Sequence, residues 1–484
     1  MKIFIEGHSF NYEIEKLCRI FLPFEKIEFI EKKVDADTLV ILSREEAYNL
    51  FVSLNLDGKS AERKLSIQPC DDKEAERQLA VMLYECFVEI TGYESRWGIL
   101  TGVRPAKLFS KLMNDLGIEG AREYFSDKLL VSPQKSNLCL DAVKGEKAII
   151  DLSEEKSISL YVGIPFCPSR CSYCSFVSHS VEQAKKLIPQ YLELLCVEIK
   201  ETGEIAKKCD LKLETVYIGG GTPTSLSAEQ LETLMNAIKE NFDIENIREY
   251  TVEAGRPDTI TIEKLNAIKL GGATRISINP QTMNDAVLEN IGRKHTADET
   301  VTAFHLAREA GFDNINMDLI AGLPGDTYES FCETIKKIKE LDPESVTIHT
   351  LSLKRSSTMN VNGEYPQLKI GEEASKMLDF GKEELEKSNL YPYYMYRQSK
   401  MVGNLENVGY SKPGFEGLYN VYIMDETHTI LACGASAVTK LRKFGYNYIE
   451  RVYNFKYPYE YINRFQEQLE RKEKILKFYD KQDN

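Results

Sequence analysis

The sequence has no apolar run long enough to cross a bilayer, and its apolar stretch at residues 1–5 is too short for a signal peptide. It also lacks an excess of basic residues, since 61 Lys and Arg stand against 75 Asp and Glu, for a net charge of −14. A general nucleic-acid binder needs a basic surface to neutralise phosphates, so this class is disfavoured. Solenoid repeats and low-complexity tracts are absent as well. We therefore expect a cytoplasmic globular protein with no nucleic-acid and no membrane partner.

A framework of paired cysteines is not indicated. The 11 cysteines are an odd number, in a chain that we expect to be cytosolic. Eight of them stand singly along the sequence and are interpreted as small buried apolar residues. The other three lie close together, and they are the first feature that points to chemistry.

The pattern along the chain predicts its domain organisation. A length of 484 residues favours two or three domains, and residues 1–150 are predicted to form an N-terminal α/β domain of unknown role. In residues 155–380, nearly continuous apolar strands alternate with helices, which is typical of a buried parallel sheet. A complete barrel would need eight such units, so we predict an α/β fold built on a partial, TIM-like (β/α)6 barrel. The six expected strands are SISLYVGI, ETVYIG, REYTVE, ATRISI, NINMDLI and SVTIHTL.

The segments around the barrel carry weaker signals. Residues 381–484 are Tyr-rich and less periodic, and we predict a mixed C-terminal region that supplies substrate-pocket and cover elements. The stretch KGEKAIIDLSEEKS at residues 144–157 is expected to be a hinge, and the Glu/Lys-rich tail from about residue 459 a solvated helical face. Three helix starts are predicted from paired capping residues. These are Ser227 with Gln230, Thr296 with Glu299, and Asp326 with Glu329.

The three neighbouring cysteines follow the first expected strand, in YVGIPFCPSRCSYCSFVSH. Cys167, Cys171 and Cys174 form a C-x3-C-x2-C pattern. A zinc site usually has four ligands, and here His179 is the one further donor nearby. A redox pair of Cys171 and Cys174 would leave Cys167 without a role. A [4Fe–4S] cluster held by three thiolates would keep one iron open for a small molecule, and the spacing favours this reading.

Other ligand-type residues stand at the ends of the expected strands. Residues 219–221 are three glycines after the second strand, where backbone groups can approach a ligand closely. Glu253, Gln281 and Asp318 end or follow the third, fourth and fifth strands. A carboxylate at the end of an apolar strand is costly unless it is paired or bound to a ligand. Arg293 could pair with such a carboxylate, and a structural salt bridge is the alternative for each of these groups.

Together these motifs resemble the radical S-adenosylmethionine (SAM) superfamily, in the branch of the oxygen-independent coproporphyrinogen III oxidases. The markers are YVGIPFCPSRCSYCSF, YIGGGTPTSL, VEAGRPDT, RISINPQTMND, IGRKHT and NMDLIAGLPGDT, and they cover residues 158–439. RWGILTGVRPAKL and YMYRQSKMVGNLENVGY further resemble the Z-type dehydrogenases of anaerobic Gram-positive bacteria. The resemblance implies a radical SAM barrel, a [4Fe–4S] cluster that cleaves SAM to a 5′-deoxyadenosyl radical, and the conversion of two propionates of coproporphyrinogen III to vinyl groups, which gives protoporphyrinogen IX.

The resemblance also assigns roles to residues and partners. Cys167, Cys171 and Cys174 would ligate the cluster, and Tyr161 would be the catalytic residue beside the cluster and SAM. One or two SAM molecules are implied, with a tetrapyrrole substrate and an electron donor such as flavodoxin or ferredoxin. The residues implied to contact SAM are Tyr161, Gly220, Gly221, Thr222, Glu253, Gln281, Arg293 and Asp318.

Two departures from the family pattern bear on the substrate. The best-known oxidases have a histidine at the position of Gly163 and a fourth cysteine at the position of Phe176. The phenylalanine is shared with the heme-chaperone relatives, so a heme-binding chaperone is an alternative function. A radical SAM methyltransferase or heme-degrading relative is another. Candidate cations for the propionates of an oxidase substrate are Arg355, Arg397, Lys400 and Lys412, and ordinary surface cations are the favoured alternative.

Overall fold

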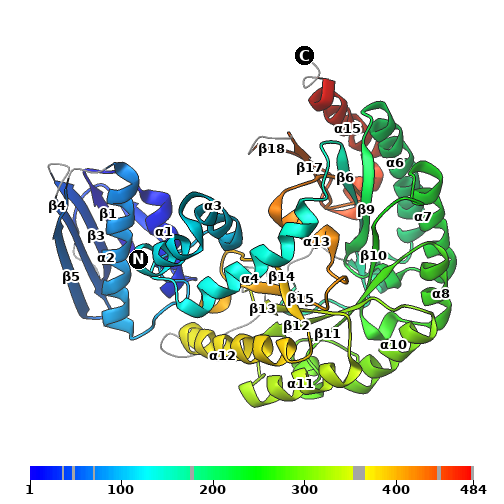
Figure 1. Cartoon of the computed structure of the whole chain (residues 1–484). Coiled ribbons are helices and arrows are strands. Elements are labelled where there is room, and N and C mark those ends of the chain that lie inside the picture. Colours follow the sequence, from blue (N-terminus) through cyan, green and yellow to red (C-terminus); the bar gives the residue numbers. More distant parts are fainter. Residues whose placement is uncertain are drawn as a thin grey trace. The chain divides into compact units, whose positions relative to one another are not determined.

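The computed structural model describes residues 1–34, 37–45, 49–68, 71–174, 179–352, 366–443 and 448–480. The chain divides into two compact units (Figure 1). Unit 1 comprises Met1–Val143, Asn360–Ser375 and Met395–Glu406, and unit 2 comprises Lys144–Met359, Lys376–Tyr394 and Asn407–Asn484. The division is therefore not linear along the sequence.

Unit 1 contains a mixed five-stranded sheet in the order β2-β1-β3-β4-β5. Because side chains alternate along a strand, Val40, Val52 and Leu54 share one face, and they are fully buried in a core with residues of helices α1 and α2. The elements of this unit begin with β1 (Lys2–Glu6), α1 (Asn11–Phe21), β2 (Glu28–Ile30), β3 (Thr38–Glu45), β4 (Asn49–Leu56), β5 (Lys59–Ser66), α2 (Asp72–Thr91) and α3 (Pro105–Glu123).

Helix α4 (Pro133–Ile150) contains the point at which unit 1 ends and unit 2 begins. The predicted hinge at residues 144–157 is therefore wrong over its first half, which is helical. Gly145 does not break the helix. A Cβ at this position would come within 2.6 Å of the Pro392 carbonyl oxygen, so the glycine permits a close approach between two backbones.

Unit 2 is built on an eleven-stranded sheet in the order β14-β15-β13-β12-β11-β10-β9-β6-β16-β17-β18. Its centre consists of the six predicted strands, which run parallel to one another, so the predicted partial barrel is confirmed. Helices α7, α8, α10 and α11 follow the outer side of this curved sheet (Figure 1). The six strands are β6 (Ser157–Ile164), β9 (Lys212–Gly220), β10 (Glu249–Gly255), β11 (Arg275–Gln281), β12 (Ile315–Ala321) and β13 (Ser345–Thr350).

Most of residues 381–484 belong to unit 2 rather than to a region of their own. β16 pairs in parallel with β6 at one side of the six strands, and β15 pairs antiparallel with β13 at the other. The sequence did not predict these strands, because short Tyr-rich segments have no clear period. The elements are α12 (Pro366–Glu386), β14 (Tyr391–Tyr396), β15 (Asn407–Ser411), α13 (Leu418–Asp425), β16 (Thr429–Cys433), β17 (Val438–Arg442), β18 (Ile449–Tyr453), α14 (Pro458–Asn463) and α15 (Phe465–Asp480).

The helices of the barrel start close to where the capping residues predict. Both partners of the boxes at Ser227 and Thr296 make their hydrogen bonds. The third prediction is wrong by one residue, since Thr327 rather than Asp326 caps α11 and accepts from the Ser330 amide. No described helix has the length and apolarity required for a membrane crossing. The helices are α5 (Val181–Ala184), α6 (Ile188–Lys208), α7 (Ala228–Asn241), α8 (Ile262–Leu270), α9 (Asp285–Asn290), α10 (Ala297–Glu309) and α11 (Tyr328–Leu341).

Candidate functional site

The cysteine loop is fastened at both ends, beyond the carboxyl end of β6. The short strand β7 (Phe166–Cys167) pairs in parallel with β8 (His179–Ser180). Cys171 is buried, and Cys167 and Cys174 are half-buried. In the described residues, no group of three His, Cys, Asp or Glu side chains could hold a single metal ion. A cubane makes a different demand, because each of its thiolates binds a separate iron.

The glycine turn after β9 lies directly against this loop. The amide of Gly221 donates to the Ile164 carbonyl, and the amide of Thr222 to the Phe166 carbonyl, each over 2.7 Å. A Cβ on Gly221 would lie 2.6 Å from the Phe166 oxygen and 3.0 Å from the Cys167 sulfur, so only glycine fits. The Thr222 hydroxyl donates to the same sulfur over 3.5 Å. Cys167 after β6 and the predicted residues Gly221 and Thr222 after β9 are thus neighbours.

Tyr161 and Glu253 lie on the inner side of the barrel strands. The Tyr161 ring stacks near those of Tyr217 and Tyr419, with centroids 6.3 Å away in both cases. The Tyr217 hydroxyl donates to Glu253 over 2.5 Å. Burial raises the pKa of the Glu253 carboxyl to about 7, although the Tyr217 hydrogen bond lowers it. Near neutral pH this group can therefore both hold and release a proton.

Asp318 belongs to a polar group on neighbouring strands. Asn316 donates to its carboxylate over 2.7 Å, and the His349 ring nitrogen Nε2 lies 3.8 Å from it. Burial acts to raise the pKa of Asp318, but the interaction with His349 and the hydrogen bond from Asn316 outweigh it and hold the pKa below its ordinary value. Asp318 therefore stays ionised where Glu253 holds a proton. The charge of Asp318 contributes to the raised pKa of Glu253.

Gln281 and Arg293 occupy the next part of the site. Gln281 ends β11 with a φ of 71°, an uncommon backbone angle for a residue with a side chain, and its buried Oε1 accepts no hydrogen bond from the residues that the structure describes. Arg293 donates to the Asn279 carbonyl over 2.6 Å and to the Tyr173 hydroxyl over 3.1 Å. Because Tyr173 stands between Cys171 and Cys174 in the sequence, this bond links Arg293 to the cysteine loop. The sequence had suggested a carboxylate as the partner of Arg293 instead.

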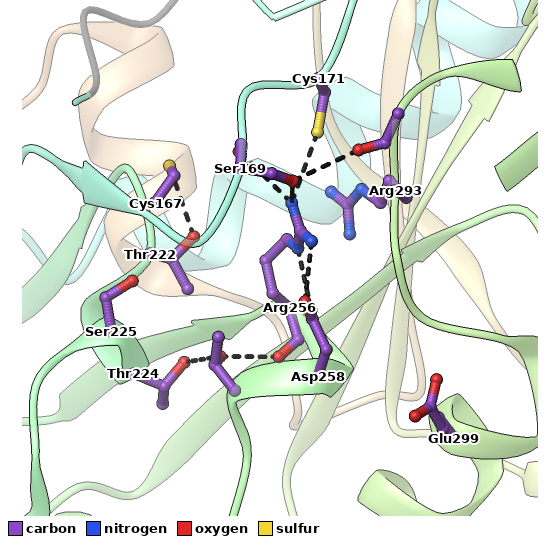
Figure 2. Close-up of polar contacts among 12 residues, drawn as sticks. Cys167, Ser169, Cys171, Thr222, Thr224, Ser225, Arg256, Asp258, Arg293 and Glu299 are labelled. Carbon is purple, nitrogen blue, oxygen red and sulfur yellow. Dashed lines mark hydrogen bonds and ion pairs between the residues drawn. The ribbon is translucent and has the colours of Figure 1, made fainter. Parts of the chain in front are cut away.

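Arg256 is a residue of the site that sequence reasoning missed. It follows β10 and is 3% exposed. Figure 2 shows its guanidinium beneath the cysteine loop, between Ser169, Cys171 and Asp258. The guanidinium forms a bidentate pair with Asp258 at 2.8 and 2.9 Å. The motif VEAGRPD could have indicated this role, because an arginine directly after a buried strand needs a partner for its charge.

Comparison with known proteins identifies relatives of this chain. The family model of the radical SAM superfamily matches residues 161–338. HemZ of Bacillus subtilis strain 168, an oxygen-independent coproporphyrinogen-III oxidase-like protein, is 40% identical over 98% of this chain and 98% of its own length. This chain belongs to the HemZ family of radical SAM proteins.

More distant relatives of this HemZ-family chain include two functional types. The heme chaperone HemW of Lactococcus lactis is 34% identical over 58% of this chain and 70% of its own. The oxygen-independent coproporphyrinogen III oxidase of Salmonella typhimurium is 34% identical over 40% of this chain and 42% of its own. In a solved structure, coproporphyrinogen III oxidase HemN of Escherichia coli is 23% identical, with a TM-score of 0.49, over 66% of this chain and 72% of HemN.

The predicted cofactors are confirmed by this membership, because radical SAM proteins use a [4Fe–4S] cluster and SAM. The HemZ-family site also fits such groups. Three thiols leave one iron of a cubane open. Gln281 has a strained backbone and a buried Oε1 to which no described residue donates, which suits a bound polar ligand, since buried polar atoms without partners are rare in folded proteins.

Of the four cations considered for the propionates, three belong to the residues that the structure describes. Arg355 lies outside the described residues. Arg397 and Lys400 belong to unit 1, where the Arg397 guanidinium donates to the Leu100 carbonyl over 2.8 Å and lies over the Trp97 ring. Lys412 pairs with Asp342 over 2.9 Å, next to the amino end of β13. That end of the strand is opposite to the one that carries the site, so Lys412 is an ordinary ion-paired cation, which was the alternative considered for it. Phe176 also lies outside the described residues.

Proposed function

We propose that this chain is an oxygen-independent coproporphyrinogen III dehydrogenase, an oxidoreductase that converts two propionates to vinyl groups. The observation that carries the proposal is the C-x3-C-x2-C loop, fastened beside the glycine turn and the inward-facing Glu253. The substrate is supported by the name of the HemZ relative, which matches nearly the whole chain. Each conversion removes a hydrogen atom, carbon dioxide and one further electron, which passes to a one-electron acceptor.

In this proposal Cys167, Cys171 and Cys174 hold the cluster and Tyr161 lies beside it. The cluster and SAM together supply a carbon-centred radical when bound. The chain's own residues position the bound groups: Glu253 and Asp318 accept hydrogen bonds, and so does the Gln281 oxygen, to which no described residue donates. The other proposed SAM contacts are Gly220, Gly221, Thr222 and Arg293.

The proposal includes a cellular setting. The protein works in the cytoplasm, with a flavodoxin or ferredoxin as the low-potential electron donor. Neither nucleic acid nor membrane takes part. Adding a reduced flavodoxin in place of dithionite tests the donor, since turnover should continue with the protein reductant alone.

The test of the activity is an anaerobic assay with coproporphyrinogen III, SAM and a reductant. We expect carbon dioxide and a divinyl product, identified by mass. Cys167→Ala should abolish both, whereas Cys196→Ala, a half-buried thiol on α6, should retain them. SAM cleavage with unchanged porphyrinogen would refute the substrate, and a product of another mass would indicate a methyltransferase or a heme-degrading enzyme.

A second candidate function is that of a heme chaperone. It is favoured by the likeness to HemW over 58% of this chain, and by Phe176, which the chaperones share. Titration with heme distinguishes the two proposals. A chaperone should give a saturable, stoichiometric shift of the Soret band and no divinyl product, whereas the dehydrogenase should give the product without such a shift.

A further inference from the structure

Arg256 is placed against a proposed cluster ligand by the turn after β10. Gly255 has a φ of 61°, and the Arg256 amide donates to the Ala254 carbonyl over 2.6 Å. This tight turn directs the side chain back toward the cysteine loop. The short helical turn Pro257–Thr259 then places Asp258 within reach of the guanidinium. The backbone therefore fixes both members of the ion pair.

The guanidinium of Arg256 is shared between Asp258 and the loop. Its Nη1 donates to the Ser169 hydroxyl over 3.0 Å and lies 3.8 Å from the Cys171 sulfur, within the range of a hydrogen bond to sulfur. The side chain of Arg256 is 4% exposed and that of Asp258 is 18% exposed. A buried pair of this kind acts as a fixed dipole, and here its positive end faces Cys171 (Figure 2).

Cys167 has a weaker donor than Cys171. Among the described residues, the Thr222 hydroxyl donates to the Cys167 sulfur over 3.5 Å, and no charged group does so. A hydroxyl is neutral, whereas a guanidinium is always charged, and charged donors make the stronger hydrogen bonds. The sulfurs of Cys167 and Cys171 therefore face donors of different charge.

We propose that Arg256 is a positioning residue that raises the reduction potential of the cluster through Cys171, with Asp258 limiting the rise. Hydrogen bonds and positive charge at a ligand sulfur stabilise the reduced cluster, which carries one more negative charge than the oxidised one. One electron enters from a low-potential donor, and no bond to Arg256 forms or breaks. The proposal rests on the cluster ligands of the proposed function but not on its tetrapyrrole substrate.

The test is a redox titration of the reconstituted full-length protein, followed by electron paramagnetic resonance and without tetrapyrrole. Arg256→Gln should shift the midpoint potential to a more negative value, because the charged donor is lost. Asp258→Asn should shift it to a more positive value, because the opposing charge is lost while an acceptor for Arg256 remains. Arg256→Lys should lie between Arg256→Gln and the wild type. Two shifts of opposite sign would not arise from a general loosening of the loop.

The matched control is Arg308→Gln, which removes another bidentate ion pair of unit 2. Arg308 binds Glu344 at 2.8 and 2.9 Å near the amino ends of the strands, so its loss should not move the potential. Unchanged potentials in Arg256→Gln and Asp258→Asn, at full iron content, would overturn the proposal. If Arg256→Gln takes up no iron, Asp258→Asn and Arg256→Lys decide it. Absence of iron from the wild type would refute the cysteine assignment instead.

Discussion

Glu253 shows how one buried carboxyl group links the site to stability. Burial raises its pKa from 4.5 to about 7. The folded chain therefore holds this proton more tightly than the unfolded chain, and the group's contribution is fully present below pH 4.5 and is lost as pH rises through 7. A shift of this size corresponds to about 3 kcal/mol, at about 1.4 kcal/mol per pKa unit.

We predict that Glu253→Gln stabilises the cofactor-free protein at pH 8 and has little effect at pH 4.5. Glutamine still accepts from Tyr217 but has no charge to bury. The difference in melting temperature between variant and wild type should grow from pH 5 to pH 8. Glu232→Gln, exposed on α7, is the control, and its curve should follow the wild type. A constant difference across this range would contradict the raised pKa.

At this scale the sequence predicted residues with a local signature. Cys167, Cys171 and Cys174 share one short motif, and Glu253 and Gln281 stand at the ends of apolar strands, which the topology brings to the same edge. Their partners could not be predicted. The bond from Tyr217 to Glu253 joins residues 36 apart, and the contact of Arg256 with Cys171 joins residues 85 apart. Such contacts follow from strand order and side-chain direction, which no local pattern encodes.

At the scale of elements, α15 is helical and largely solvated as predicted, but it also carries a buried face that the sequence did not indicate. The sequence suggested a solvated helix, but Lys472 lies 2.9 Å from Glu198 of α6, and both side chains are at most 1% exposed. Four further groups donate to the same carboxylate, which are Asn454, the Tyr461 hydroxyl, Gln468 and the Gly434 amide. A Glu/Lys-rich pattern cannot show which lysine is buried. The apolar barrel strands, by contrast, were correctly predicted, because both of their faces are covered.

We predict that Lys472→Met destabilises unit 2 by about 3–5 kcal/mol, since it leaves Glu198 charged and buried. Lys477→Met on the same helix is the control. Lys477 is 71% exposed and lies 3.6 Å from Glu473, so its loss should cost less than about 1 kcal/mol. Urea unfolding followed by circular dichroism measures both. Equal costs for the two variants would show that α15 does not carry a buried pair.

At the scale of the molecule, unit 1 includes two segments that are distant in sequence from its N-terminal part. Unit 1 takes Asn360–Ser375 and Met395–Glu406, which the linear division at residues 150 and 380 assigns elsewhere. Trp97 in the N-terminal part donates to Glu406 over 2.7 Å, and Lys135 reaches the same carboxylate over 2.6 Å. A division of this kind depends on contacts across about 300 residues, so composition along the chain does not indicate it.

Because two later segments belong to unit 1, we predict that residues 1–150 do not fold alone. Without Glu406, Lys135 and the Trp97 N–H lose a buried acceptor, and without Leu368 the core of unit 1 loses one of its apolar residues. Trp97 is the single tryptophan and is fully buried, so its fluorescence reports on unit 1. The fragment 1–150 should show red-shifted emission and a broad thermal transition, whereas the full chain should show blue-shifted emission. A fragment with blue-shifted emission and a sharp transition would prove that the N-terminal part is an independent domain. In that case Asn360–Ser375 and Met395–Glu406 would add stability to unit 1 but would not be required for its folding.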